Sequence, residues 1–271
     1  MNKVLKKLLP EEVARFIKKI VLTFRKYYYM GDAYYCPVCG SHFRKLLTGG
    51  FDLEVIKEKE IIGAGRRKNT VCPYCQSTDR DRLIFLYLKN KVDIFNKKLK
   101  ILHIAPEPSL YKFLKKRKNL VYLTGTKYSE GIYFHQNIDA VDLLQIPYKD
   151  EEFDMVICNH VLEHIIEDYK AMSEIYRVLI KGGLAILQVP ISYKINSTYE
   201  DITITSEAMR EKHFGQFDHV RIYGKDYVTR LEKAGFRVEM YNAFNDADID
   251  VKLSNFALNQ KENLFIGHKD K

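Results

Sequence analysis

The chain has 271 residues, of which 46% are hydrophobic and 29% charged, with 14 Gly, 7 Pro and a formal net charge of +9. This composition supplies ample apolar material for a packed core and excludes a collagen-like or fully disordered chain. No apolar run approaches the ~18 uncharged residues that a membrane-spanning helix needs, so we do not expect an integral membrane protein. The length allows one large domain, or one large and one small.

Residues 1–29 are predicted to form a basic helical segment, because residues 1 to 30 contain eight Lys or Arg against two Glu. Apolar residues recur there at spacings of three and four around Pro10, which predicts a short helix followed by a longer amphipathic one. Such a helix can lie on a membrane surface or bind a protein partner, but we favour packing of its apolar stripe on the rest of the chain. Dispersed charge and the lack of a small-residue cleavage site argue against a signal peptide, so we expect a reducing, cytoplasmic setting.

Residues 30–82 are predicted to form a small zinc-ribbon module. Four of the five cysteines fall into two CxxC pairs separated by 32 residues, namely Cys36, Cys39, Cys72 and Cys75. Two residues between cysteines let a tight turn direct both thiolates at one tetrahedral ion, and four thiolates leave no open coordination position. The pattern therefore predicts a structural Zn²⁺, with a redox dithiol or an iron site as the alternative. Cys158 is expected to be a buried strand residue rather than a fifth ligand.

Residues 83–271 are predicted to form a large α/β domain, because short apolar runs alternate with helical stretches from about residue 100 onward. This pattern favours a mainly parallel sheet. The clearest helix is expected over residues 161–179. Seven strands are expected, over residues 100–104, 121–125, 136–139, 153–158, 183–189, 236–241 and 264–268.

The carboxyl ends of parallel strands are where such sheets bind ligands. After the first expected strand the chain reads Ala105-Pro106-Glu107-Pro108, where a dinucleotide-binding domain would have GxGxxG. A Walker motif is also missing from the sequence. These features argue against NAD, FAD and nucleoside triphosphates, while a nucleoside cofactor without phosphates is less constrained.

The stretch from Asp142 to His164 resembles the class I S-adenosylmethionine-dependent methyltransferases, specifically the methyltransferase type 11 group. It has an acid after the third strand, "FD" opening the fourth, "NHVLEH" after it and "IYRVLIKGGLAIL" leading into the fifth. The resemblance covers about residues 100–243 and implies a Rossmann-like fold that binds S-adenosylmethionine. A bacterial and archaeal subgroup with a CPxCG ribbon in front and an "FGQxDHVRxYG" segment is more similar still, matched here by residues 214–224.

The resemblance implies cofactor-binding roles at the adenosine end. Asp142 corresponds to the family's acid that accepts a hydrogen bond from the adenine amino group, and the backbone N–H of Leu143 would meet a ring nitrogen. Thr126 stands where the family usually has an acid that holds both ribose hydroxyls. Because a hydroxyl can bond one ribose oxygen, this departure predicts a loss of roughly 1 to 2 kcal/mol in binding.

At the methionine end, the resemblance implies that Asn159 and His160 flank the methyl group. Ala105 and Glu107, in the loop after the first strand, would face the ammonium group of the cofactor. Each residue also has an ordinary structural interpretation, such as a turn former at Asp142 or a locally bonded residue at His160.

Methyl transfer from a sulfonium needs proximity, orientation and a dry site, and it needs a base only if the acceptor must lose a proton. The candidate catalytic residues are His160, His164 and His219, and His213, Asp218 and Glu163 are further titratable groups nearby in the sequence. The (D/N)PPY sequence typical of base-amino methyltransferases is missing, which favours hydroxyl or carbon acceptors. Residues 198–224 follow the fifth strand and form either an acceptor surface or a solvated loop.

Three functions stay open from the sequence. The leading hypothesis is a methyltransferase acting on a small molecule or glycan, with the ribbon as a structural or docking module. An RNA methyltransferase is the second, because of the +9 charge and the ribbon. A non-catalytic binding protein on a methyltransferase scaffold is the third, because of Thr126 and the altered first loop.

Overall fold

The computed structural model describes residues 10–127, 138–249 and 253–270. Its central sheet consists of β5 (Leu99–Ile104), β6 (Leu120–Thr126), β7 (Asp139–Ala140), β8 (Phe153–Cys158), β9 (Leu179–Ile186), β12 (Arg237–Tyr241) and β13 (Leu264–His268). The strand order is β12-β13-β9-β8-β5-β6-β7. Strands β7, β6, β5, β8 and β9 run parallel, whereas β13 is antiparallel to both of its neighbours. The predicted α/β fold with a seven-stranded, mainly parallel sheet is confirmed.

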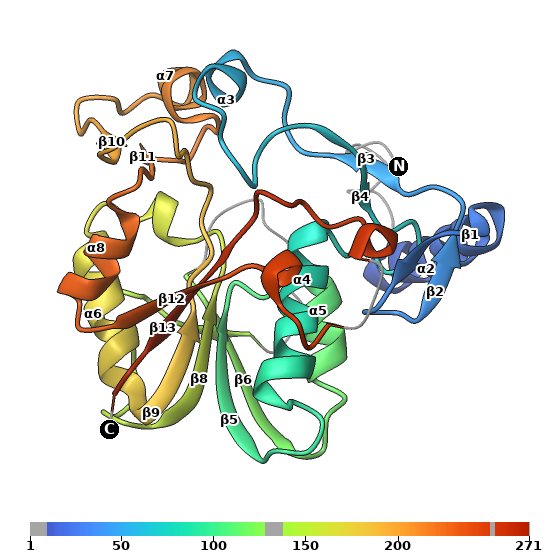
Figure 1. The fold of residues 1–271 in the computed structure, drawn as a ribbon, viewed down its shortest axis with the longest axis horizontal. Coiled ribbons are helices and arrows are strands. Elements are labelled where there is room, and N and C mark those ends of the chain that lie inside the picture. Colours follow the sequence, from blue (N-terminus) through green and yellow to red (C-terminus); the bar gives the residue numbers. More distant parts are fainter. Residues whose placement is uncertain (1–9, 128–137, 250–252, 271) are drawn as a thin grey trace.

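Helices cover both faces of this sheet (Figure 1). One layer contains α4 (Asp79–Tyr87), a π-helical turn (Leu88–Val92) and α5 (Pro108–Leu114), and the other contains α6 (Asp168–Val178) and α8 (Tyr227–Lys233). Side chains of β8 alternate between the layers: Met155 and Ile157 pack with α4 and α5, while Val156 and Cys158 pack with α6 and α8. Cys158 is fully buried, as expected from its position in a central strand.

The helix expected over residues 161–179 is shorter than the pattern predicted, and this expectation is corrected. A 3₁₀ turn, η2 (Leu162–His164), precedes α6, which begins at Asp168. The Leu162 carbonyl accepts from the Ile165 N–H of this 3₁₀ turn and also from the Arg221 guanidinium, which bonds the Ile166 carbonyl as well. The strand expected over 183–189 likewise runs over Leu179–Ile186, because Leu179 already pairs with Phe153.

The amino-terminal third contains α2 (Glu11–Tyr28), the hairpin of β1 (Met30–Cys36) and β2 (Ser41–Phe43), the pair β3 (Leu47–Gly49) and β4 (Arg67–Val71), and α3 (Glu54–Glu58). The remaining elements are β10 (Tyr199–Glu200), α7 (Glu207–Phe214), β11 (Arg221–Ile222), η3 (Ala243–Asn245) and η4 (Leu253–Phe256). The short helix expected before Pro10 lies outside the described residues, as do residues 136 and 137 of the third expected strand.

The segment between the two cysteine pairs, residues 40–71, extends away from the cysteine cluster. Around α3 it reaches α7 at the top of the molecule in Figure 1, where Val55, Ile56 and Ile61 form a small apolar core with Phe214 and Ile222. A β-bridge also joins Ile62 to Ile191, just beyond β9. This loop therefore packs over the carboxyl edge of the large sheet.

Helix α2 contradicts the favoured expectation that its apolar stripe packs on the chain. Leu22, the only buried residue of the helix in the described region, lies opposite the stripe, and Lys26 on the same side sits over the Tyr74 ring. The stripe itself faces solvent: Phe16, Ile20 and Phe24 are 64%, 52% and 67% exposed. The helix is attached through its basic side because Leu22 interrupts that side. Across the described residues, no helix combines the length and the apolar character needed to cross a membrane.

Candidate functional site

The four cysteines of the two CxxC pairs converge on one point. Cys36 Sγ lies 3.6 Å from Cys75 Sγ, Cys39 Sγ lies 3.8 Å from Cys72 Sγ, and all four sulfurs are within 4.8 Å of one another. The two turns share one conformation. Gly40 and Gln76, each following the second cysteine of its pair, have φ of 66° and 64°, and each donates its N–H to the first cysteine's carbonyl. The Ser77 hydroxyl lies 3.2 Å from Cys36 Sγ and 3.1 Å from Cys75 Sγ.

Helix α4 starts directly after the second pair and joins the cysteine cluster to the large domain. Its Arg82 is fully buried and donates to four carbonyls, those of Thr70, Ser77, Phe256 and Ala257, at 2.7 to 3.0 Å. Sequence reasoning missed this residue. The signal was a second arginine in "TDRDR", placed among the apolar residues that open the helix.

The carboxyl ends of β5 and β6 hold the predicted residues of the first two loops. Ala105 has a φ of 45°, and its N–H donates to the carbonyl of Gly125. Glu107 lies 2.9 Å from Nε2 of the fully buried His103. Burial opposes ionisation of Glu107, but the contact with His103 lowers its pKa overall. The Thr126 hydroxyl is half-buried and contacts the carbonyl of Lys127.

Asp142 follows β7, and Leu143 after it is buried. One oxygen of Asp142 lies 2.8 Å from Lys127 Nζ, and the other accepts from the Leu144 N–H at 3.0 Å. The hydrogen bond from Lys127, followed by that from Leu144, lowers the pKa of Asp142. The carboxylate therefore stays ionised, and 42% of the side chain is exposed.

Beyond β8 and β9, buried polar side chains have atoms without a partner among the described residues. The atoms without a partner are Oδ1 and Nδ2 of Asn159 and Oε1 of Gln188. The other amide atom of Gln188, Nε2, donates to Glu262 at 2.8 Å. A backbone hydrogen bond joins the segments that follow β8 and β9, since the His160 N–H donates to the Gln188 carbonyl at 2.7 Å. Unpaired buried polar atoms are uncommon because each costs ~1 to 3 kcal/mol, so this edge is suited to a polar ligand.

His160 is held in a left-handed conformation with a φ of 52°, and its ring lies against the guanidinium of Arg80 from α4. Burial and the adjacent Arg80 charge lower the pKa of His160 to about 4. The loop between the cysteine pairs comes down onto this ring. At Gly63, an added Cβ would lie 3.4 Å from His160 Cε1 and 3.1 Å from Glu262 Oε1. Arg80, the second residue missed from the sequence, also donates to the Gly63 carbonyl.

The structure brings His164 and His219 together around Glu163, whose side chain is 1% exposed. Nε2 of each histidine lies 3.9 Å from Glu163 Oε1, and the rings are in edge-to-face contact. Burial opposes ionisation of Glu163, but His160 and then the other two imidazoles lower its pKa to about 2. Of the other titratable candidates, Asp218 lies 3.2 Å from His164 Nδ1, whereas His213 is placed apart and contacts Tyr199.

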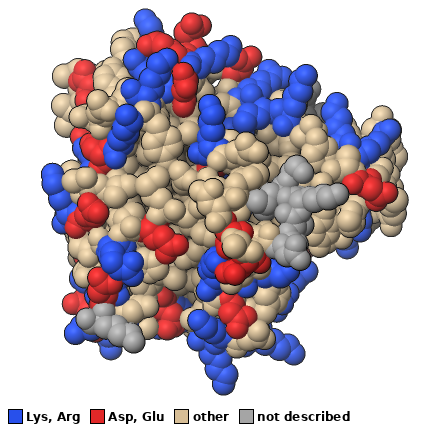
Figure 2. Space-filling model, viewed as in Figure 1, with Lys and Arg blue, Asp and Glu red and all other residues tan. Residues whose placement is uncertain are grey.

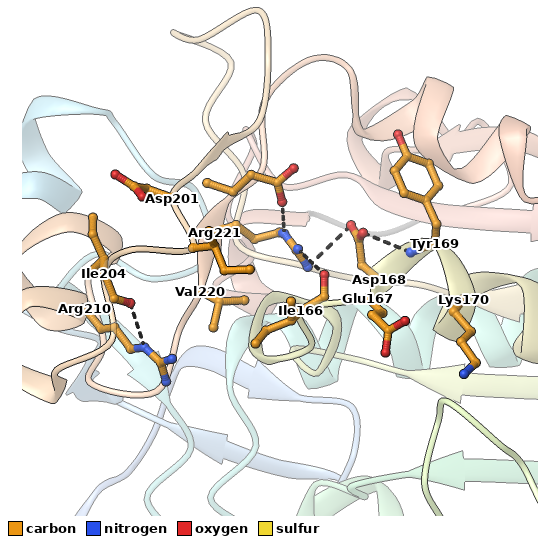
Figure 3. Close-up of a pocket in the computed structure, with 12 residues that line it drawn as sticks. Ile166, Glu167, Asp168, Tyr169, Lys170, Asp201, Ile204, Arg210, Val220 and Arg221 are labelled. Carbon is orange, nitrogen blue, oxygen red and sulfur yellow. Dashed lines mark hydrogen bonds and ion pairs between the residues drawn. The ribbon is translucent and has the colours of Figure 1, made fainter.

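Arg221 ties the 214–224 segment to the turn that carries Glu163. It donates to the carbonyls of Leu162 and Ile166 and lies 2.8 Å from Glu200, while the Val220 N–H donates to the Glu163 carbonyl. Figure 3 shows Arg221 directed at Asp168 and Ile166 in the wall of a surface pocket of about 450 Å³. Its lining comes from residues 166–170, 200–202, 204, 210, 220 and 221, so it opens beside the histidine cluster rather than at the cofactor loops.

Residues 99–187, which run from β5 to the end of β9, match the model of a protein family described as a methyltransferase domain. The matched segment, about a third of the chain, is thus similar to a methyltransferase domain. Fifty residues, 18% of the chain, are 44% identical to an uncharacterised protein of Methanocaldococcus jannaschii, and the match spans only 22% of that relative's length.

Solved structures similar to this chain are distant in sequence. A SAM-dependent methyltransferase from Archaeoglobus fulgidus is 13% identical with a TM-score of 0.44, covering 70% of this chain and 94% of that one. A putative methyltransferase from Bacillus halodurans is 18% identical with a TM-score of 0.40, covering 68% and 99%. The Haloferax volcanii complex between the Trm112 methyltransferase activator and a putative methyltransferase gives 14% identity and a TM-score of 0.41, covering 71% and 94%.

Proposed function

We propose that the protein transfers a methyl group from S-adenosylmethionine to a hydroxyl or carbon atom of a small molecule or glycan. The observation that carries the proposal is a set of buried polar atoms, those of the Asn159 amide and Gln188 Oε1, which have no hydrogen-bond partner among the described residues and lie at the carboxyl edge of the segment that matches a methyltransferase domain. When bound, S-adenosylmethionine supplies an electrophilic methyl carbon on a positively charged sulfur. Glu107, ionised at neutral pH, is placed on the same edge and suits an ammonium group.

The remaining proposed contacts follow the strand ends in order. Asp142 is ionised and partly exposed, and a carboxylate that already bonds Lys127 and Leu144 retains acceptor sites for an amino group. Ala105, Thr126, Leu143 and His160 would complete the cofactor site through backbone or side-chain contacts. His160 is neutral at pH 7, so the ring adds no positive charge near a sulfonium.

Calorimetry with S-adenosylhomocysteine, the demethylated cofactor, tests this proposal. We expect saturable binding to the full chain, and binding at least tenfold weaker for Asp142→Ala. Asp139→Ala is the matched control, because Asp139 is an exposed aspartate in β7, three residues before Asp142. No heat of binding at millimolar ligand would refute the enzymatic proposal and favour the non-catalytic scaffold.

We further propose that the four cysteines hold a structural Zn²⁺. Sulfurs bound at about 2.3 Å to a tetrahedral ion lie ~3.8 Å apart, which the 3.6 and 3.8 Å separations match. The Ser77 hydroxyl, within 3.2 Å of two of these sulfurs, would support the thiolates from the outer shell. A closed set of four thiolates fits folding support rather than catalysis.

The exposed stripe of α2 supports a further proposal, that this helix rests on an anionic membrane surface. Its aromatic and β-branched residues face outward, while five Lys or Arg residues against two Glu give the helix a basic character. Co-sedimentation with vesicles of phosphatidylglycerol and phosphatidylcholine should capture the protein, and Phe24→Ser should reduce capture severalfold. Phe217→Ser, which alters another exposed phenylalanine outside α2, is the control. Capture unaffected by Phe24→Ser would leave a protein partner as the better proposal.

An RNA acceptor is the second candidate function, supported by the +9 net charge. On the face shown in Figure 2, Lys and Arg gather along the upper rim, but Asp and Glu are interspersed with them. Mixed charge of this kind weakens the electrostatic grip on phosphates that RNA binding requires. Retention on RNA that falls steeply with salt would support the RNA acceptor over the small molecule.

A further inference from the structure

A second group of side chains that could bind a metal ion lies in the large domain, and it consists of a carboxylate and two imidazoles instead of thiolates. Glu163, His164 and His219 place one carboxylate oxygen and two ring nitrogens within 4.8 Å of one another. Both carboxylate oxygens of Glu163 are buried and have no hydrogen-bond partner among the described residues. A carboxylate in this state needs a cation or a protonated donor close to it.

In each of the two histidines, Nδ1 already contacts a protein oxygen, which leaves Nε2 for an ion. Nδ1 of His164 lies 3.2 Å from the Asp218 carboxylate, and Nδ1 of His219 lies 3.3 Å from the Phe214 carbonyl. Histidine ligands of metal ions characteristically donate this second N–H to a carboxylate or a backbone carbonyl, which directs the lone pair of the first nitrogen at the ion. Here both free Nε2 atoms are directed toward the Glu163 carboxylate.

The separations also fit a shared ion better than direct pairing. Nε2 of His164 and of His219 both lie 3.9 Å from Glu163 Oε1, too far for a hydrogen bond. Two ligand atoms at about 2.1 Å from one ion can be up to ~4.2 Å apart. A third imidazole, that of His160, also lies near Glu163, with Nδ1 3.3 Å from Oε1. The same nitrogen is 2.8 Å from the Arg80 guanidinium, and this neighbouring positive charge disfavours a metal ion at His160, so we leave it out of the ligand set.

The fold builds this arrangement from two segments distant in sequence. The Val220 N–H donates to the Glu163 carbonyl at 2.9 Å, next to His219 in the chain. Arg221 fixes the same turn through the carbonyls of Leu162 and Ile166. The cluster is therefore held in place by backbone contacts and does not depend on the long side chains of surface residues.

We propose that Glu163, His164 and His219 bind a divalent first-row transition ion, such as Mn²⁺, Fe²⁺, Co²⁺ or Zn²⁺, and that this ion binds an oxygen of the methyl acceptor. Two imidazoles and one carboxylate suit these ions rather than Mg²⁺ or Ca²⁺, and they leave coordination positions open. This role for the ion rests on the proposed methyltransferase function and restricts it to hydroxyl acceptors. The ion favours breaking of the acceptor O–H bond, the electron pair stays on the oxygen, and the proton passes to water.

Mn²⁺ is the probe of choice because thiolates bind it poorly, so the cysteine cluster does not compete. The full chain, treated with a chelator and titrated with MnCl₂, should remove one equivalent of Mn²⁺ from the free-ion electron paramagnetic resonance signal. Glu163→Gln and His219→Asn should weaken this binding at least tenfold, and Asp218→Asn should weaken it by a smaller factor. Glu239→Gln is the matched control, since Glu239 also lies beside a histidine, 3.0 Å from His268 Nε2, and should bind as the wild type does.

The outcomes separate this site from the proposed function. No Mn²⁺ binding at millimolar ion, or equal binding by a Glu163→Gln variant with the wild-type circular dichroism spectrum, overturns the site. Mn²⁺ binding together with failure to bind S-adenosylhomocysteine upholds the site and refutes the proposed function. Methyl transfer to a hydroxyl that is unchanged by chelation overturns the assigned role of the ion.

Discussion

Replacing Arg82 by Met should destabilise the whole chain rather than one part of it. The Arg82 guanidinium is fully buried and donates to the carbonyls of Thr70, Ser77, Phe256 and Ala257. A hydrogen bond to a charged group contributes ~1.5 to 3 kcal/mol, and each abandoned carbonyl carries a desolvation cost. Because burying the charge offsets part of this gain, we expect a loss of about 4 kcal/mol rather than the full sum.

Urea denaturation followed by circular dichroism measures this loss as a lower midpoint at constant slope. The matched control is Arg66→Met, because Arg66 is exposed and lies 3.9 Å from its partner Asp52, and a surface pair of this kind contributes less than ~1 kcal/mol. A loss below about 1 kcal/mol for Arg82→Met would refute the reasoning. Separate transitions for the cysteine module and the sheet would refute the claim that Arg82 joins them.

Three further outcomes are expected. Elemental analysis should find thiolate-bound zinc in the wild type, and Cys39→Ser should lose that zinc and lower the melting temperature; retention of the ion would contradict the four-cysteine site. Proton NMR should show His160 titrating near pH 4, since burial and then Arg80 lower its pKa, and Arg80→Ala should raise the midpoint without restoring the ordinary 6.5. The unfolded chain then binds more protons between about pH 4 and 6.5, so the free energy of unfolding should fall as the pH drops through this window; a midpoint near 6.5 would exclude it. Tyr223→Phe removes a hydroxyl that donates to a buried carboxylate at 2.9 Å and should cost about 1 to 2 kcal/mol, whereas Tyr27→Phe at an exposed position should cost nothing measurable.

The sheet could be predicted because its strands are short apolar runs with turn residues between them. β8 is the clearest example: "FDMVIC" is apolar on both faces, as a central parallel strand must be, and the predicted bounds match. The helix after it was predicted too long, because periodicity continues through the 3₁₀ turn. That turn is fixed by Arg221, which lies 59 residues beyond Leu162 and therefore outside any local pattern.

The chemistry of single residues was harder to predict than their positions. Spacing alone gave the cysteine cluster, since both ligands of each pair sit in one turn. The contact between Glu163 and His219 depends on how two distant segments fold together, so the sequence could only suggest the histidines one at a time. Arg80 was missed for the same reason, because its position against His160 arises from helix packing.

The contact between Gly63 and His160 connects the loop between the cysteine pairs to a titrating group in the large domain. The loop that carries Gly63 begins and ends at the cysteine pairs, yet at Gly63 it packs against the His160 ring, where an added Cβ would lie 3.4 Å from His160 Cε1 and 3.1 Å from Glu262 Oε1. If the cysteine end of this loop loosened, the loop would move off His160 and water would reach the ring. Because burial is the main cause of its lowered pKa, the pKa of His160 would then rise toward its usual value. We therefore expect the titration of His160 to report whether the distant cysteine cluster is intact, without any label or cofactor.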